Sequence, residues 1–360
     1  MNDTPASSGH RWWQPGPLHW SRIEMLLMRA GFALLVFSTI KWETGAWTSQ
    51  KFPNGMAHFA DLTWIAKSPP GLALKTLTLS GLAAYVAGWF PVLGLIPALF
   101  FSLVIGTLGN SQGAINHSTQ MVTMILLAQW LAYLIPRRSP LERSARHWTR
   151  PSLGTQQQVI WWSTVVIAAS YVVCGVVKLV NSNFMWLHDA PYLAVQLLKT
   201  NWSHFHDTLE MPPTWLQSVT QALVDHPHWA RLFFGMGLLI ELCGFVILIN
   251  RRWASLGGVA IIALHLSISH VMSLNFTSHI YAVLIFLVNA PGWVLPHRKP
   301  WFLCRSGPPF LCPTPKPPTA SDRLTSPLQK SKIGNPKSSI TYSHRPARSP
   351  SRSNANGDPF

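Results

Sequence analysis

Charged side chains are scarce in this chain. Only 11% of its 360 residues are Asp, Glu, Lys or Arg, whereas 48% are hydrophobic, and the charged share is about half that of an average soluble domain. This balance excludes intrinsic disorder over most of the chain. Together with 18 Trp and several apolar runs of roughly twenty residues, it indicates a polytopic membrane protein rather than a soluble enzyme.

Cysteines and catalytic motifs are also few. Cys174 and Cys243 lie inside apolar runs and Cys304 and Cys312 lie near the C-terminus, so their spacing predicts neither a zinc site nor a disulfide framework. The sequence contains no Gly-rich phosphate loop, no Gly-x-Ser-x-Gly elbow and no His-Glu-x-x-His metal motif. Function must therefore be sought in single polar residues within the apolar runs, and no metal is expected.

The apolar runs predict eight helices. Their ranges are 23–41, 71–90, 92–109, 117–135, 159–180, 229–249, 254–272 and 279–295. We expect an all-α fold, a polytopic integral membrane bundle of about eight transmembrane helices. The first run lacks a small-x-small cleavage site, which favours a retained helix over a signal peptide. The predicted organisation is an N-terminal segment at 1–22, a transmembrane domain at 23–303 and a C-terminal tail at 304–360.

Lys and Arg beside the runs predict orientation. Five arginines and a single acid occupy 136–158, Arg251 and Arg252 separate two runs, and Arg298 and Lys299 follow the last run. These segments are expected inside. The predicted outer loops at 110–116, 181–228 and 273–278 hold only Lys199 as a Lys or Arg. We therefore expect a multi-pass protein of the cell membrane with both termini in the cytoplasm.

The tail at 304–360 has eleven Pro, ten Ser, nine basic residues and two acids. With few large apolar residues to offset the entropy of ordering, it is predicted to be disordered. A basic segment beside the inner membrane face is expected to contact anionic lipid, at roughly 1 kcal/mol per basic residue. Nucleic acid is the less favoured partner.

Two ionisable residues fall inside the predicted bilayer, where charges normally face the bundle and have partners. Counting 1.5 Å per residue from the inner ends, Arg29 lies about 9 Å deep and Glu241 about 12 Å deep. Their matching depths favour a structural ion pair between the first and sixth helices. The alternative is that Glu241 acts as an acid or base.

A second group of titratable residues is predicted near the outer side. It comprises Lys178, His117, His265, His270 and His279. Singly, each histidine could bond to backbone or headgroups, and Lys178 could reach the interface. Together, they indicate a site where a lysine among apolar side chains loses part of its preference for the charged form and becomes a base, with histidines relaying its proton. Apolar patches at 192–198 and 215–224 are expected to form short interfacial helices over this layer, either as a lid or as a passive cap.

Four stretches, in order, resemble the vitamin K-dependent gamma-carboxylase and HTTM (horizontally transferred transmembrane) domain family. They are Gly113-Ala-Ile-Asn-His117, Tyr171-Val-Val-Cys-Gly-Val-Val-Lys178-Leu179 followed by Trp186, Leu239-Ile-Glu241, and His265 followed by Met272-Ser-Leu-Asn-Phe276 and Ile280 to Phe286. The similarity spans roughly 20–300. A large lumenal portion typical of the carboxylase is not seen in this sequence, and His265 is followed by Leu-Ser-Ile-Ser rather than by the family's Asn-Ser.

The resemblance implies that Lys178 is the base that deprotonates a reduced quinone, with His117 and His265 as supporting groups. The implied cofactor or substrate is reduced vitamin K or menaquinone, and the implied activity is epoxidase- or carboxylase-like. The alternative is a non-catalytic membrane protein that binds a lipid, a peptide or a partner subunit. Transport of a small molecule is least favoured, because charge in the middle of the predicted bilayer is rare.

Overall fold

The computed structural model describes residues 20–40, 55–111, 119–135 and 149–294. These ranges contain helices and no strand, which confirms the all-α prediction for them. The chain divides into a unit at 1–298 and a unit at 299–360, and all the described residues belong to the first. The predicted N-terminal segment, apart from its last residues, and the predicted tail lie outside the described residues.

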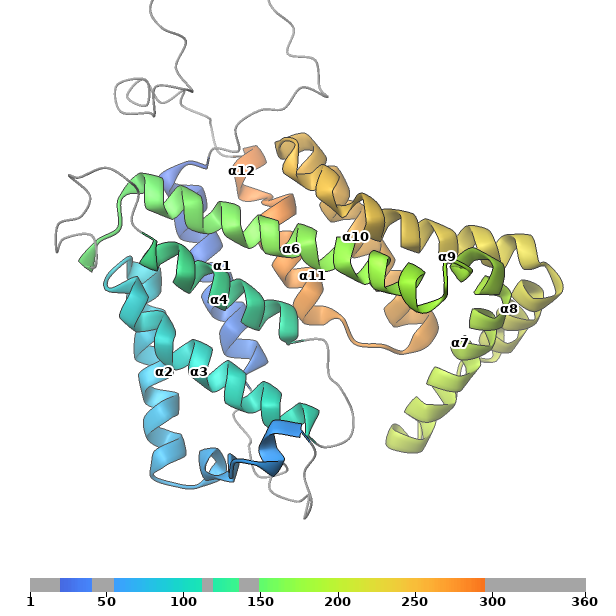
Figure 1. Cartoon of the computed structure of the whole chain (residues 1–360), viewed down its shortest axis with the longest axis horizontal. Coiled ribbons are helices and arrows are strands. Elements are labelled where there is room, and N and C mark those ends of the chain that lie inside the picture. The colour runs from blue at the N-terminus through green and yellow to red at the C-terminus, as the bar shows by residue number, and fades with distance from the viewer. Residues whose placement is uncertain (1–19, 41–54, 112–118, 136–148, 295–360) are drawn as a thin grey trace, which may run out of the picture. The chain divides into compact units, whose positions relative to one another are not determined.

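Each of the eight predicted segments coincides with a helix or with consecutive helical pieces (Figure 1). The main helices are α1 (Arg22–Thr39), α2 (Pro70–Ala87), α3 (Pro91–Asn110), α4 (Gln120–Leu134), α6 (Leu153–Asn181), α7 (Trp186–Thr208), α8 (Thr214–Asp225), α9 (Pro227–Leu242), α10 (Arg251–Met272), α11 (Thr277–Val283) and α12 (Pro291–Val294). The 3₁₀ segment Cys243–Leu248 continues α9, and the π-helical turn Leu284–Val288 continues α11. Short 3₁₀ turns lie at Gly55–His58 and Thr63–Ala66.

Local sequence explains where several helices begin and end. Ser21 and Glu24 form a capping box at the start of α1, which satisfies two backbone N–H groups that have no partner within the helix. Ser152 and Asn250 cap α6 and α10 in the same way with one side-chain acceptor each. Helix α2 ends at Gly88, whose φ of 73° lies in the left-handed region that glycine adopts without strain.

Five helical stretches of the described chain are long and apolar enough to cross a membrane. They are Pro91–Asn110, Leu153–Asn181, Pro227–Leu248, Arg251–Met272 and Thr277–Val294, and they indicate a multi-pass membrane protein. The other three predicted spans do not reach that standard. Helix α1 carries three charges and α2 includes a lysine among several Thr, Ser and Gly residues, while the 15 residues of α4 extend only about 22 Å.

Small residues allow the helices of the first half of the bundle to approach closely. A Cβ at Gly81 of α2 would collide with the backbone of Gly94 in α3, so these glycines set a close α2–α3 contact. The hydroxyl of Tyr85 donates to Gln129 at 2.8 Å, and Gln129 donates to Ser163 at 2.9 Å. This buried chain of hydrogen bonds joins α2, α4 and α6.

The beginning of α1 is held to the C-terminal helices by one buried carboxylate. Glu24, only 1% exposed, accepts a hydrogen bond from Arg251 Nη2 at 2.6 Å and one from Asn289 Nδ2 at 3.1 Å. The Arg251 guanidinium also lies 5.7 Å from the centre of the Trp293 ring. The first and last described helices therefore close onto each other through polar contacts.

Candidate functional site

The last turn of α6 brings Lys178 against Glu241 of α9. Lys178 Nζ lies 2.5 Å from Oε1 and 2.6 Å from Oε2 of this carboxylate. The Glu241 side chain is 9% exposed and that of Lys178 is 35% exposed, so the carboxylate is covered while the lysine side chain is only partly covered. The ring of Trp186 lies 5.6 Å from Nζ, within the range of a cation–π contact.

A close helix crossing produces this pair. A Cβ on Gly175 would lie 2.9 Å from Leu242 Cδ2, and one on Gly244 would lie 3.1 Å from Tyr171 Cβ. Larger residues at either glycine would push α6 away from α9 and its 3₁₀ continuation. Lys178 lies one helical turn beyond Gly175, and Glu241 directly precedes Leu242, so the crossing aligns the two charges.

The predicted pair of Arg29 with Glu241 is not formed, because Glu241 is bound to Lys178. The prediction assumed helices of equal tilt with their ends in common planes. In the structure the last turn of the 29-residue α6 meets the C-terminal end of α9, where its 3₁₀ continuation begins. Counting residues from the predicted helix ends therefore misjudges which charges meet. Arg29 is buried elsewhere in the bundle, and its Nε and Nη1 have no hydrogen-bond partner.

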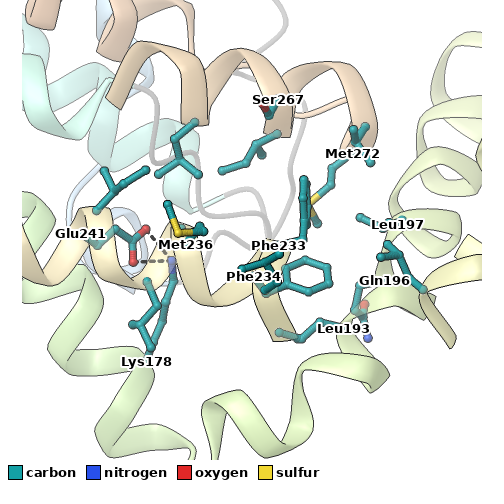
Figure 2. A pocket seen from close by; sticks show the side chains of 18 of the residues that line it. Lys178, Leu193, Gln196, Leu197, Phe233, Phe234, Met236, Glu241, Ser267 and Met272 are labelled. Atoms are coloured by element: carbon teal, nitrogen blue, oxygen red, sulfur yellow. Dashed lines mark hydrogen bonds and ion pairs between the residues drawn. The ribbon is translucent and has the colours of Figure 1, made fainter. Parts of the chain in front are cut away.

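A large cavity opens beside the pair (Figure 2). It lies between α7, α9 and α10 and has a volume of about 890 Å³. Ligand pockets usually have volumes of roughly 300 to 1,000 Å³, so this cavity is large enough for a ligand. Lys178 and Glu241 are its only charged lining residues in the described chain. Its walls are mainly apolar side chains, among them Phe233, Met236 and Met272, with Gln196 and Ser267 as further polar groups.

The segment predicted to form either a lid or a passive cap lines part of this cavity. Two helices occupy it as expected, but α7 is much longer than the apolar patch at 192–198 that predicted it, whereas α8 closely follows the patch at 215–224. Asn201 of α7 donates to the carbonyl of Val271 and accepts from Ser273, each at 2.8 Å. These bonds fasten α7 to the end of α10 over the cavity.

Two of the predicted histidines, His265 and His270, contact aromatic side chains instead of Lys178. His265 is buried, and its Nε2 lies 2.6 Å from the hydroxyl of Tyr171. Its ring stacks on Phe276 at 4.7 Å and lies 5.4 Å from the ring of His279. His265 is absent from the cavity lining, while His270 stacks on Trp215 instead, with ring centres 5.2 Å apart. His117 lies outside the described residues.

Sequence reasoning did not identify Tyr171 as a polar partner. The available signal was its spacing of seven residues from Lys178, which places both on one face of a helix.

Within the described ranges, no three His, Cys, Asp or Glu residues gather closely enough to hold a metal ion. The arrangement instead offers a charged head and an apolar chamber, suited to an amphiphilic organic molecule. No family model, curated protein or solved structure matches the chain.

Proposed function

We propose that this chain is an integral membrane protein that binds a lipid-soluble molecule in the cavity between α7, α9 and α10. The observation that carries the proposal is a chamber of about 890 Å³ with one ion pair at its edge and mostly apolar walls. An apolar body would occupy the chamber, and a hydroxyl or carbonyl group would reach Lys178. A quinone or quinol carrying an isoprenoid chain has this division into a polar ring and an apolar tail.

The membrane arrangement belongs to the same proposal. All eight helical segments cross the membrane, with one face of α1, α2 and α4 packed against neighbouring helices, and the protein resides in the cell membrane with both termini cytoplasmic. A covered helix needs less hydropathy than a lipid-facing one, because part of its surface meets protein. The many arginines between α4 and α6 support an inner position for that loop.

Chemistry on the bound molecule is the second candidate, and contact of Lys178 with the cavity favours it. For Lys178 to act as a base, its amine must first transfer a proton to Glu241, 2.5 Å away. Exclusion of water by a ligand favours this transfer, because an ion pair loses solvation in an apolar chamber. The neutral amine then takes the proton from a quinol hydroxyl, whose O–H electrons remain on the quinol oxygen for reaction with O₂. This is the role implied by the resemblance to the HTTM and gamma-carboxylase family.

Binding and chemistry can be tested separately. Full-length protein purified in neutral detergent is expected to retain menaquinone detectable by mass spectrometry, and Lys178→Met is expected to reduce the retained amount. Lys199→Met is the matched control, since Lys199 is exposed on α7 and absent from the cavity lining. Equal retention by all three proteins would refute a binding role for Lys178.

For the chemical step, purified protein is incubated with reduced menaquinone and O₂. Lys178→Ala is expected to abolish formation of the epoxide while the Lys199→Met control retains it. A Lys178→Ala protein that converts the quinol at the parental rate would remove Lys178 from the reaction. If the parental protein binds menaquinone but forms no epoxide, the catalytic role is refuted and the non-catalytic binding function remains.

A further inference from the structure

The chamber between α7, α9 and α10 is open along its α9 wall. Leu232, Phe233 and Met236 line it, and in the described chain they are 54%, 44% and 49% exposed. Residues three or four positions apart share a face of a helix, and Leu239, three residues beyond Met236, is also exposed but does not line the chamber. The rim formed by Leu232, Phe233 and Met236 therefore lies on the outward face of α9 and is the open side of the chamber.

In a membrane, this open side meets hydrocarbon. Helix α9 with its 3₁₀ continuation, Pro227–Leu248, and α10, Arg251–Met272, are two of the stretches long and apolar enough to cross a bilayer. The exposed residues of the rim are apolar, and the charged lining residues among those described, Lys178 and Glu241, pair with each other. Lipid chains rather than water therefore border the chamber on this side.

The size of the chamber limits how much of a long molecule it encloses. Its α9 wall runs from Trp229 to Glu241, which is about 18 Å along the helix axis. At about 30 Å³ for each methylene-sized group, the volume of about 890 Å³ holds about 30 such groups, roughly a naphthoquinone head with four isoprene units. A longer isoprenoid tail has to leave the chamber, and the open side gives it a path into the bilayer.

Acyl chains of the bilayer compete for the same space. An apolar chamber continuous with lipid is filled by hydrocarbon, because an empty one would forfeit the dispersion contacts of its walls. A ligand tail that displaces an acyl chain exchanges one set of apolar contacts for another, since lipid is as apolar as the tail. The tail then adds little selectivity, whereas a polar head gains hydrogen bonds at Lys178 and Glu241 that an acyl chain cannot form.

We infer that the chamber opens sideways to the bilayer, that phospholipid acyl chains enter it there, and that its ligand is selected by the polar head and not by the length of the tail. The first two statements require only that α9 and α10 lie in a membrane, whereas the third rests on the proposed binding of a quinone. The observation that carries the inference is the exposed rim of Leu232, Phe233 and Met236, which is continuous with the outward face of α9.

The test uses the full chain in phosphatidylcholine vesicles in which part of the lipid carries a diazirine in its acyl chain. After irradiation, peptide mass spectrometry locates the lipid adducts. An adduct is expected at Ile268, which lines the chamber, and at Leu266, which is 55% exposed outside it, but not at Ile261, which is buried. Labelling of Leu266 without Ile268 would overturn the inference.

A filled chamber provides the matched variant. Ala263→Trp adds an indole to the chamber wall and is expected to lower the Ile268 adduct at least about fivefold, because close-packed space does not admit both groups. Leu266→Trp adds the same indole outside the chamber and is expected to leave the Ile268 adduct unchanged. Equal Ile268 labelling in the two variants would mean that the chain does not reach it through the chamber.

Competition separates this inference from the proposed quinone binding. Menaquinones with four and with eight isoprene units, at equal mole fractions of the lipid, are expected to lower the Ile268 adduct to extents within about twofold of each other. Squalene, an isoprenoid hydrocarbon without a polar head, is expected not to compete. Competition by the shorter menaquinone alone, or equal competition by squalene, would overturn selection by the head. An Ile268 adduct that neither menaquinone lowers would support the open side and refute the quinone as ligand. If Ala263→Trp fails to fold, the competition decides the outcome.

Discussion

Lys178 Nζ contacts both carboxylate oxygens of Glu241, at 2.5 and 2.6 Å, at the edge of the cavity between α7, α9 and α10. The pair joins α6 to α9 and presents the amine to the chamber. Its position depends on Gly175, which allows α6 to approach Leu242 closely. The same two residues therefore link the packing of the bundle to the proposed ligand site.

Removing one member of this pair is expected to destabilise the protein. Glu241→Leu leaves the ammonium of Lys178 without its partner, and Lys178→Met leaves a covered carboxylate. Because Lys178 is 35% exposed, the expected loss is about 1 to 3 kcal/mol for each variant, below the range for fully buried pairs. The Lys178→Met/Glu241→Leu double variant is expected to recover much of it. Melting in detergent measures all three proteins, and additive losses in the double variant would show that the pair is not coupled.

Filling the cavity is expected to displace the proposed ligand while leaving the ion pair intact. Ala263 of α10 lines the chamber, and Ala263→Trp would occupy space needed by an apolar molecule. Leu266→Trp is the control, since Leu266 is 55% exposed on the same helix and does not line the cavity. Retained menaquinone, measured by mass spectrometry, should fall at least about tenfold in Ala263→Trp only, a change of about 1.4 kcal/mol. Equal retention in both variants would place the ligand elsewhere.

The hydrogen bond between Tyr171 and His265 is expected to stabilise the contact of α6 with α10. Tyr171→Phe removes the hydroxyl and leaves His265 Nε2 buried without this partner, at an expected cost of about 1 to 3 kcal/mol. Tyr281→Phe serves as the control, because Tyr281 is 51% exposed on α11. Thermal melting compares the two, and a Tyr171→Phe protein as stable as the parent would mean that this bond contributes little.

Glu24 is expected to be the most important polar residue for closing α1 onto the C-terminal helices. Glu24→Gln keeps the size of the side chain but removes the charge that Arg251 contacts at 2.6 Å. Because the carboxylate is almost fully buried, the expected destabilisation is about 3 kcal/mol. Glu210→Gln is the control, since Glu210 is exposed. Folded yield and melting temperature measure the effect, and equal values for the two variants would contradict it.

Much of the helical layout follows from local pattern. Apolar runs of roughly twenty residues predict helices because in such stretches only an internally hydrogen-bonded backbone is stable in lipid. Pro91 and Gly88 mark the break between α2 and α3, as their backbone preferences require. Hydropathy predicted membrane crossing less completely. Helix α1 contains charged residues, α2 contains polar residues and α4 is short, so these three helices are not among the stretches that are long and apolar enough to cross a membrane.

The candidate site was predicted only in part. Lys178 and Glu241 stand out as charges in apolar surroundings, so their importance can be read from composition alone. Their pairing cannot, because it depends on where α6 crosses α9 and on Gly175 at that crossing. His265 was expected beside Lys178 in an outer layer, whereas in the structure it is buried, bonds to Tyr171 and stacks on Phe276.

The amino-acid sequence by itself determined the all-helical character of the described chain, the approximate limits of its helices and the few charged residues placed among apolar ones. These properties depend on neighbours along the chain, through hydrogen bonding, capping and hydropathy. Only the tertiary structure decided that Glu241 meets Lys178, that Arg29 is buried without a carboxylate, and that α7, α9 and α10 enclose a chamber. Tilt and crossing position decide these contacts, because a small change in either moves a side chain to a different neighbour.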